Sequence, residues 1–301
     1  MSTKTNSATV GAALVALSAL GYSTNPIFGK LSYQFGANAV SLLAIRYSIA
    51  AALLWATVAL RGESHGLSTR QKLRLTVLGG FGMGMVSMLY FVALQHIGAS
   101  LATGLFYTYP AFVAVVGLVR GEGITRTGLA GLLLTAAGTW LLLGSDLGGF
   151  TWTGALLILS SAGLYTMYIV VSDAWTRGIA PTVSATYVTT GALIVSLVAA
   201  AAARPAVPGV GAFLAGGGLA LFSTILAMIT FFAGLPRVGP TRAAIISTLE
   251  PVFTALLAAA ALHEHLSPLQ SLGIFLVVTG AVAAQQRERA NAKKTSQPVK
   301  A

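Results

Sequence analysis

The segment GASLATGLFYTYPAFVAVVGLVRGE, residues 98–122, decides the fold, because the chain contains a second version of it. The second version is GPTRAAIISTLEPVFTALLAAAALHE, residues 239–264. Each version begins with glycine, carries a proline at a matching place (Pro110 and Pro251) and ends with glutamate. A repeat is the first feature to look for in a new sequence, and this one predicts two related structural units.

The match between the two units extends beyond the quoted segments. Aromatic, leucine and glycine positions recur in register: Tyr90, Phe91, Leu94 and Gly98 align with Phe231, Phe232, Leu235 and Gly239, and Gly131 and Gly138 with Gly273 and Gly280. We therefore expect a first unit at residues 1–146 and a second at 147–286. The remaining residues, 287–301, are polar and basic, which predicts a disordered cytoplasmic tail close to anionic lipid.

The composition indicates that lipid is the main solvent of this chain. It is 55% hydrophobic and only 8% charged, whereas a soluble domain carries about 25% charged residues. The net charge of +11 does not indicate nucleic-acid binding, because the basic residues lie in short gaps between apolar runs, as membrane-topology signals do. The absence of cysteine excludes disulfides, thiolate chemistry and cysteine-ligated metal sites.

The apolar runs predict ten membrane-spanning helices. A bilayer core of about 30 Å requires about 20 apolar residues as helix. The predicted spans are at about 8–29, 38–60, 75–94, 99–119, 127–145, 152–172, 181–203, 211–234, 241–262 and 268–286. Because five is odd, two consecutive five-helix units must lie in opposite orientations, as in alternating-access transporters. We expect an all-α membrane protein of two inverted five-helix repeats around a central cavity.

The distribution of basic residues predicts the orientation. Fifteen Lys and Arg residues fall on one side of the ten spans, and two, Lys30 and Arg204, fall on the other. Cytoplasmic loops carry the excess of Lys and Arg. Both termini are therefore expected in the cytoplasm.

Two spans carry polar stripes with the same spacing. The stripes consist of Ser18, Tyr22, Asn25 and Gly29 in one span and Ser161, Tyr165, Tyr168 and Ser172 in the other. This spacing places each set on one helix face, which in lipid turns towards another helix or towards water. We interpret the small residues as packing positions. For Tyr22, Asn25, Tyr165 and Tyr168, packing and cavity lining both fit.

Further polar and aromatic side chains lie in other spans: Tyr90, Thr103, Tyr107 and Tyr109 in the first unit and Thr224, Phe231 and Ser247 in the second. Tyr107, Tyr109, Tyr165 and Tyr168 lie in the middle of their spans, which favours an interior position over an interfacial one. Pro26, Pro110 and Pro251 also lie within spans. Each proline removes a backbone hydrogen bond and can kink its helix, which leaves a carbonyl group free to line a cavity.

Two ionisable residues are placed well inside predicted spans. Arg46 is expected to pair with carbonyl groups or tyrosine hydroxyls in a structural role, because an unpaired charge there is costly. Glu250 is either a packing carboxyl group or a group that exchanges protons or binds a substrate amine. His263, Glu264 and His265 do not have zinc-helix spacing, and no nucleophile or cofactor motif is present. We expect no enzyme, no metal and no cofactor.

These residues resemble the drug/metabolite transporter superfamily, in its ten-span EamA-type branch. The likeness rests on Tyr-Pro-x-Phe at 109–112, on Glu-Pro-Val-Phe at 250–253, on the closing Glu122 and Glu264, and on Arg46 beside an aromatic residue. It covers about 10–285, but Tyr109 stands where the second unit has Glu250, and the first span lacks a Trp often seen in the family. The resemblance implies a central cavity and movement of small solutes, commonly export of amino acids or other metabolites, across a bacterial inner membrane.

The combined prediction is a secondary transporter that exports a small amphipathic metabolite, with amino acids as the favoured class. Its partners are the small-molecule substrate and the lipid bilayer, with protons as coupling ion if Glu250 titrates, and no nucleic acid. A passive channel or uniporter is the alternative, and the sequence does not choose between monomer and dimer. The predicted substrate-binding residues are Tyr22, Asn25, Tyr90, Thr103, Tyr107, Tyr165, Tyr168, Thr224, Phe231, Ser247 and Glu250.

Overall fold

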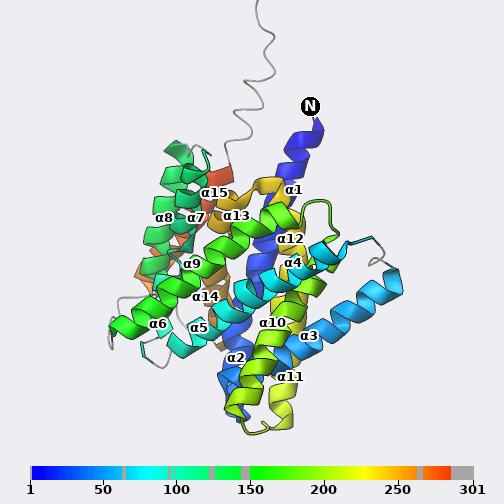
Figure 1. Cartoon of the computed structure of the whole chain (residues 1–301). Coiled ribbons are helices and arrows are strands. Elements are labelled where there is room, and N and C mark those ends of the chain that lie inside the picture. The colour runs from blue at the N-terminus through cyan, green and yellow to red at the C-terminus, as the bar shows by residue number, and fades with distance from the viewer. Residues whose placement is uncertain are drawn as a thin grey trace, which may run out of the picture.

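The computed structural model is helical throughout the part of the chain that it describes, without a β-strand there, as predicted for an all-α protein. The helices form one bundle, with α7, α8 and α15 on one side and α3, α10 and α11 on the other (Figure 1). Helices α1, α9 and α12 lie between these groups (Figure 1). The described residues are 2–62, 66–93, 96–97, 99–121, 126–143, 150–262 and 267–285.

The helices follow one another with short connections. The first half contains α1 (Ser2–Ser23), α2 (Asn25–Gln34), α3 (Ala39–Arg61), α4 (Thr69–Gly79), the π-helix η1 (Gly80–Gly84), α5 (Met85–Ala93), α6 (Ala99–Phe106), α7 (Tyr109–Val119) and α8 (Arg126–Leu143). The second half contains α9 (Trp152–Trp175), α10 (Pro181–Ala203), α11 (Val210–Gly218), the π-helix η2 (Leu219–Leu226), α12 (Ala227–Val238), α13 (Pro240–Ser247), α14 (Leu249–Leu262) and α15 (Pro268–Gln285).

Seven helical stretches among the described residues are long and apolar enough to cross a membrane. They are Ser7–Gln34, Ala39–Arg61, Thr69–Tyr90, Ala102–Val119, Trp152–Trp175, Pro181–Ala203 and Val210–Val238, and Pro268–Ala283 is a shorter apolar helix. They correspond to seven of the ten predicted spans. The predicted spans 127–145, 241–262 and 268–286 correspond to α8, to α13 with α14, and to α15.

The helix that contains the third predicted span, about 75–94, begins before the apolar run. Helix α4 begins at Thr69, so three basic residues expected in the preceding gap lie in its first two turns. The cause is a capping box, in which Ser68 and Gln71 satisfy each other's backbone N–H groups. A capped polar turn therefore extends the helix beyond its apolar part.

Three of the predicted spans are interrupted, each shortly before a proline. The interruptions fall between α1 and α2, between α6 and α7, and between α13 and α14, ahead of Pro26, Pro110 and Pro251. A threonine hydroxyl at each interruption donates to a carbonyl oxygen one turn back: Thr24 to Gly21 at 2.8 Å, Thr108 to Leu105 at 2.7 Å and Thr248 to Ile245 at 2.6 Å. The expected interruption of the helices near the prolines is confirmed.

The two π-helices occupy equivalent places in the two halves. The register that aligns Pro110 with Pro251 places the whole of η1 opposite residues of η2. A π-helix widens the backbone locally and occurs frequently at functional sites. Both halves therefore carry the same irregularity in their third predicted span. In sequence, this span precedes the one that is interrupted near Pro110 or Pro251.

Glycines bring α8 and α15 into close contact. A Cβ atom added at Gly138 would lie 2.7 Å from the carbonyl oxygen of Gly273, and one added at Gly280 would lie 2.7 Å from that of Gly131. These are the four glycines that match between the two sequence repeats, and they contact each other reciprocally. Small residues of this kind allow membrane helices to approach closely.

We expect Gly138→Ala to lower the free energy of unfolding by about 1–3 kcal/mol, because the added methyl group overpacks the contact with α15. Gly217→Ala is the matched control. Its Cβ meets no atom within 4 Å, so the better helix former should stabilise by about 0.5–1 kcal/mol. Thermal unfolding in detergent measures both, and equal stability of the two variants would contradict the close contact.

Candidate functional site

Aromatic rings from α5, α9 and the α6–α7 interruption form a continuous cluster, which we call the ring cluster. Phe106 lies at its centre, with ring centroids 5.6 Å from Tyr90, 5.6 Å from Tyr109 and 5.4 Å from Tyr165. Tyr165 meets Tyr109 edge-on at 4.9 Å and stacks on Tyr168 at 5.7 Å. Tyr107 joins through Phe106 at 6.2 Å and Tyr109 at 6.0 Å. Such contacts fix the relative orientation of the rings.

The predicted site residues differ in how deeply they are buried. Tyr168 and Phe231 are each 2% exposed and stack at 6.5 Å, so they belong to the packed core behind the cluster. Glycine is required at Gly82 of η1, because a Cβ atom there would collide with the Tyr168 ring. The other predicted aromatic residues, apart from the buried Tyr22, are half-buried and have surface available for contact: Tyr90, Tyr107 and Tyr165.

Glu250 lies beside the ring cluster, in the first turn of α14. Its side chain is half-buried, and it interacts electrostatically with Tyr107, Tyr22, Tyr90 and Tyr109. The helix N-terminus favours a negative charge at this place. The predicted intramembrane acid is thus surrounded by the aromatic hydroxyl groups that the sequence singled out.

Other predicted polar residues are arranged around this acid. The hydroxyl groups of Tyr90 and Thr103 are 2.8 Å apart, which joins α5 to α6. Ser247 ends α13 and is 7% exposed. The Tyr90–Thr103 pair and Ser247 therefore lie at the edges of the ring cluster, next to the α6–α7 and α13–α14 interruptions.

Arg46 is buried and bonded to three neutral acceptors. Its Nε donates to Thr224 Oγ1 at 2.8 Å, its Nη1 to Asn25 Oδ1 at 3.0 Å and its Nη2 to the Ser223 carbonyl oxygen at 2.8 Å. The guanidinium group also lies 5.3 Å from the ring centroid of Tyr47. The network ties α3 to α2 and η2. The expected structural role of Arg46 is confirmed, and Asn25 and Thr224 contribute to it.

The interruption between α1 and α2 is bonded to both η2 and α14. Ser223 Oγ is 2.8 Å from Thr24 Oγ1 and 3.2 Å from the Gly21 carbonyl oxygen. Thr254 Oγ1 donates to the Ser23 carbonyl oxygen at 3.3 Å. Carbonyl groups released near the proline are therefore used as acceptors by helices of the second half.

The sequence interpretation missed Phe106 and Ser223 as parts of this region. Phe106 lies in the same aromatic run as Tyr107 and Tyr109, so the run itself was a usable signal. Ser223 is next to the predicted Thr224 but gains its role from the π-helix, which has no sequence pattern.

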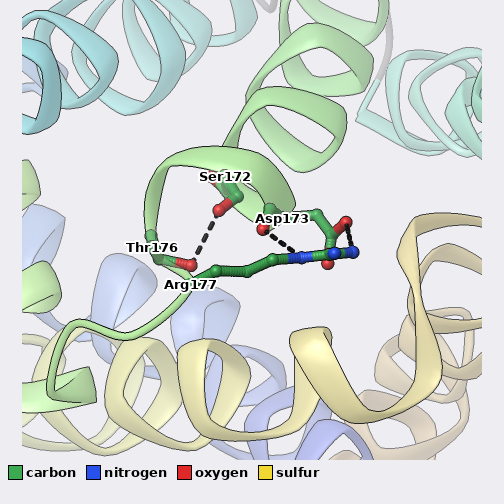
Figure 2. Close-up of polar contacts among 4 residues, drawn as sticks. All are labelled: Ser172, Asp173, Thr176 and Arg177. Carbon is green, nitrogen blue, oxygen red and sulfur yellow. Dashed lines mark hydrogen bonds and ion pairs between the residues drawn. The ribbon is translucent and has the colours of Figure 1, made fainter.

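Asp173 provides a contrast to Glu250. At the C-terminal end of α9, its Oδ2 accepts from Arg177 Nη2 at 2.6 Å, and its carbonyl oxygen accepts from Arg177 Nε at 3.1 Å (Figure 2). Thr176 Oγ1 donates to the Ser172 carbonyl oxygen one turn back (Figure 2). The charge of Asp173 is paired with Arg177, which lies just beyond the end of α9 and outside the ring cluster.

The described residues contain no group of three or more His, Cys, Asp or Glu side chains that could hold a metal ion. The segment His263-Glu264-His265, and the closing Glu122, lie outside the described residues. The site therefore consists of rings, hydroxyl groups and one carboxyl group.

The chain matches the EamA-like transporter family in two segments, residues 9–144 and 152–284. It is 25% identical to "Uncharacterized transporter YcbK" of Bacillus subtilis, with 92% of this chain and 94% of the relative covered. It is 27% identical to an "Uncharacterized transporter" of Archaeoglobus fulgidus (89% and 94% covered). It is 26% identical to "Uncharacterized inner membrane transporter YedA" of Escherichia coli (79% and 78% covered).

The fold is also found in a solved structure, titled only as the crystal structure of a protein. It superposes with a TM-score of 0.80 at 23% identity, over 95% of this chain and 99% of that one. The names of the family and of the relatives indicate a transporter and not an enzyme. As the sequence resemblance predicted, the chain is a multi-span membrane protein that belongs to the EamA-like transporter family.

Proposed function

We propose that the protein is a secondary transporter that exports a small amphipathic metabolite across the bacterial inner membrane, with amino acids as the favoured class. The observation that carries the proposal is the ring cluster beside Glu250, where half-buried Tyr90, Tyr107 and Tyr165 lie next to interrupted helices. Rings bind the apolar part of such a solute, while hydroxyl and carboxyl groups bind its polar part.

Alternating access between two inverted five-helix repeats is the mechanism that we propose. Corresponding helices of the two halves make corresponding contacts with the opposite half, which supports a repeat. Helix α1 packs on α12 and its counterpart α9 packs on α5, while α8 packs on α15 and α3 on α10. Ten spans result when α8, α13 with α14, and α15 are counted with the seven long helices. Substrate sites of such transporters lie at discontinuous helices between the repeats.

Within this site the predicted residues divide into two groups. We assign direct contact with substrate to the half-buried residues Asn25, Tyr90, Thr103, Tyr107, Tyr165 and Glu250. The buried residues Tyr22, Tyr168, Thr224, Phe231 and Ser247 support the walls of the site. The excess of basic residues on one side supports cytoplasmic termini, and the printed name of YedA supports the inner membrane. Glu250 is the group that would exchange a coupling proton.

Tyr165→Ala is expected to lower the rate of substrate counterflow in proteoliposomes about thirtyfold. Losing the apolar contact between the Tyr165 ring and the substrate removes about 2 kcal/mol of binding, and each 1.4 kcal/mol is tenfold. The substrate is first identified by thermal shift of the purified protein against amino acids, nucleosides, vitamins and quaternary amines. Tyr33→Ala is the control, because Tyr33 is 43% exposed and outside the cluster. Equal rates for wild type and Tyr165→Ala would remove Tyr165 from the site.

A passive channel or uniporter is the second candidate, because a half-buried polar interior also suits diffusion of a solute. Counterflow separates a channel from a carrier. Substrate on the far side accelerates uptake by a carrier, whereas a channel shows no such stimulation.

A further inference from the structure

Tyr109 and Glu250 occupy equivalent positions in the two repeats, each directly before the proline of an interrupted span. Tyr109 is 1% exposed, and its hydroxyl group donates to the carbonyl oxygen of Ala244 at 3.3 Å. This hydrogen bond joins α7 of the first half to α13 of the second. In the register that aligns the two prolines, its counterpart is a bond from Glu250 to the carbonyl oxygen of Thr103, between α14 and α6.

The two equivalent places are packed differently. Helix α7 packs on α13, whereas their counterparts α14 and α6 do not pack extensively on each other in the described part of the chain. Ala244 is buried where Thr103 is half-buried. Thr248 is buried where Tyr107 is half-buried. One of the two equivalent contacts is therefore closed and the other is open, as expected for one end state of a transporter in which inverted repeats alternate.

The counterpart contact requires a proton on Glu250. A carbonyl oxygen only accepts hydrogen bonds, and so does an ionised carboxylate, so these two groups cannot bond to each other. A protonated carboxyl group has an O–H that donates, as the Tyr109 hydroxyl group does. Because glutamate is shorter than tyrosine, α14 must come closer to α6, and the small side chains of Ala102, Thr103 and Gly104 allow that approach.

Glu250 is surrounded by groups that keep their charge state near neutral pH. Arg46 acts on it from α3, and Arg126 and Arg242 lie in the first turns of two helices packed against α14. Arginine stays protonated and tyrosine stays neutral in this range, so the carboxyl group of Glu250 is the group of this set whose charge changes. The surrounding tyrosines are Tyr22, Tyr90, Tyr107, Tyr109 and Tyr165.

We propose that Glu250 is a proton-dependent latch, which donates to the Thr103 carbonyl oxygen when protonated and holds the outer side of the transporter closed, as Tyr109 holds the inner side closed in this structure. The inner side is the cytoplasmic one in the orientation proposed above. During export, a hydronium ion on the outer side gives its proton to the Glu250 carboxylate and leaves water. The acid returns that proton to water on the inner side. The inference rests on the proposed alternating access and adds the bond through which protons drive it.

The test measures two distances by electron paramagnetic resonance between pairs of spin labels, in protein reconstituted in lipid. The chain has no cysteine, so introduced cysteines are the only attachment sites. The outer pair is Leu156→Cys, on the exposed face of α9, which packs on α6, with the exposed Leu256→Cys on α14. The inner pair is its counterpart, Ala13→Cys on α1, which packs on α13, with Val115→Cys on α7.

In the wild-type background, acidic buffer is expected to shorten the outer distance and to lengthen the inner one. The ratio of outer-closed to outer-open molecules should rise about tenfold, because a hydrogen bond replaces an unfavourable contact between two acceptors. Asp173→Asn is the control and should keep this response, since Asp173 is paired with Arg177.

Two substitutions of Glu250 separate the bond from the charge. Glu250→Gln carries an amide N–H₂ group that donates at every pH, so it should show the acidic distances in both acidic and alkaline buffer. Glu250→Leu has no donor and should show the alkaline distances in both. Tyr109→Phe loses the bond to Ala244, so its inner side should open more readily while its response to pH remains.

A response to pH in Glu250→Gln or Glu250→Leu equal to that of the wild type would overturn the latch. Glu250→Gln that matches Glu250→Leu would also overturn it, because the amide would then form no closing bond. These results leave alternating access standing as long as the two distances change in opposite directions. Distances that never do so would contradict alternating access itself, and the latch with it. No substrate is needed for either readout.

Discussion

Replacing Arg46 with methionine is expected to lower the free energy of unfolding by about 3 kcal/mol. Methionine fills much of the same space but leaves Asn25 Oδ1, Thr224 Oγ1 and the Ser223 carbonyl oxygen without their donors. Each hydrogen bond to a charged group contributes about 1.5–3 kcal/mol, and relief from burying the charge offsets part of that loss. Thermal unfolding in detergent is the measurement.

Arg70→Met is the matched control for this prediction, because Arg70 is exposed at the start of α4 and should be replaced with little effect. Arg46→Lys should be intermediate, since an ammonium group cannot reach three acceptors with the geometry of a planar guanidinium group. A melting temperature of Arg46→Met equal to that of Arg70→Met would show that the network does not hold α3 to α2 and η2.

Replacing Glu250 with glutamine is expected to reduce accumulation of substrate against its gradient, driven by a pH difference, at least a hundredfold. Glutamine keeps the shape and the contact with Tyr107 but cannot take up or release a proton. Counterflow needs no net proton movement, so it should stay within about fivefold of wild type, given that one contact is worth about 1 kcal/mol. Both assays use reconstituted protein and the substrate identified by thermal shift.

Asp173→Asn is the control for Glu250→Gln, because Asp173 is the other acid among the described residues and is paired with Arg177 (Figure 2). It should retain accumulation driven by the pH difference. If Glu250→Gln accumulates substrate as well as wild type, Glu250 is a packing residue and another group or ion provides the coupling.

The sequence by itself determined the solvent, the family and the places where helices are interrupted. Long apolar runs report lipid directly, because a membrane helix satisfies its backbone within its own segment. Proline acts on its own helix, so Pro110 and Pro251 mark the interruptions without knowledge of neighbours. The polar spacing likewise brought Tyr165 into the candidate set, and the structure places it near Glu250.

Only the tertiary structure decided which of these side chains pack and which remain accessible. Arg46 donates hydrogen bonds to Ser223 and Thr224 of η2, far away in the sequence. Because η2 is a π-helix, it leaves no periodic signal in the sequence. Tyr165 and Tyr168 share one polar stripe, yet Phe231 of α12 and Gly82 of η1 bury Tyr168 alone. Helical periodicity places residues on a face, but the helices packed against that face, from either half of the chain, decide whether it is closed. Local pattern therefore predicted the candidates, and packing between the halves sorted them.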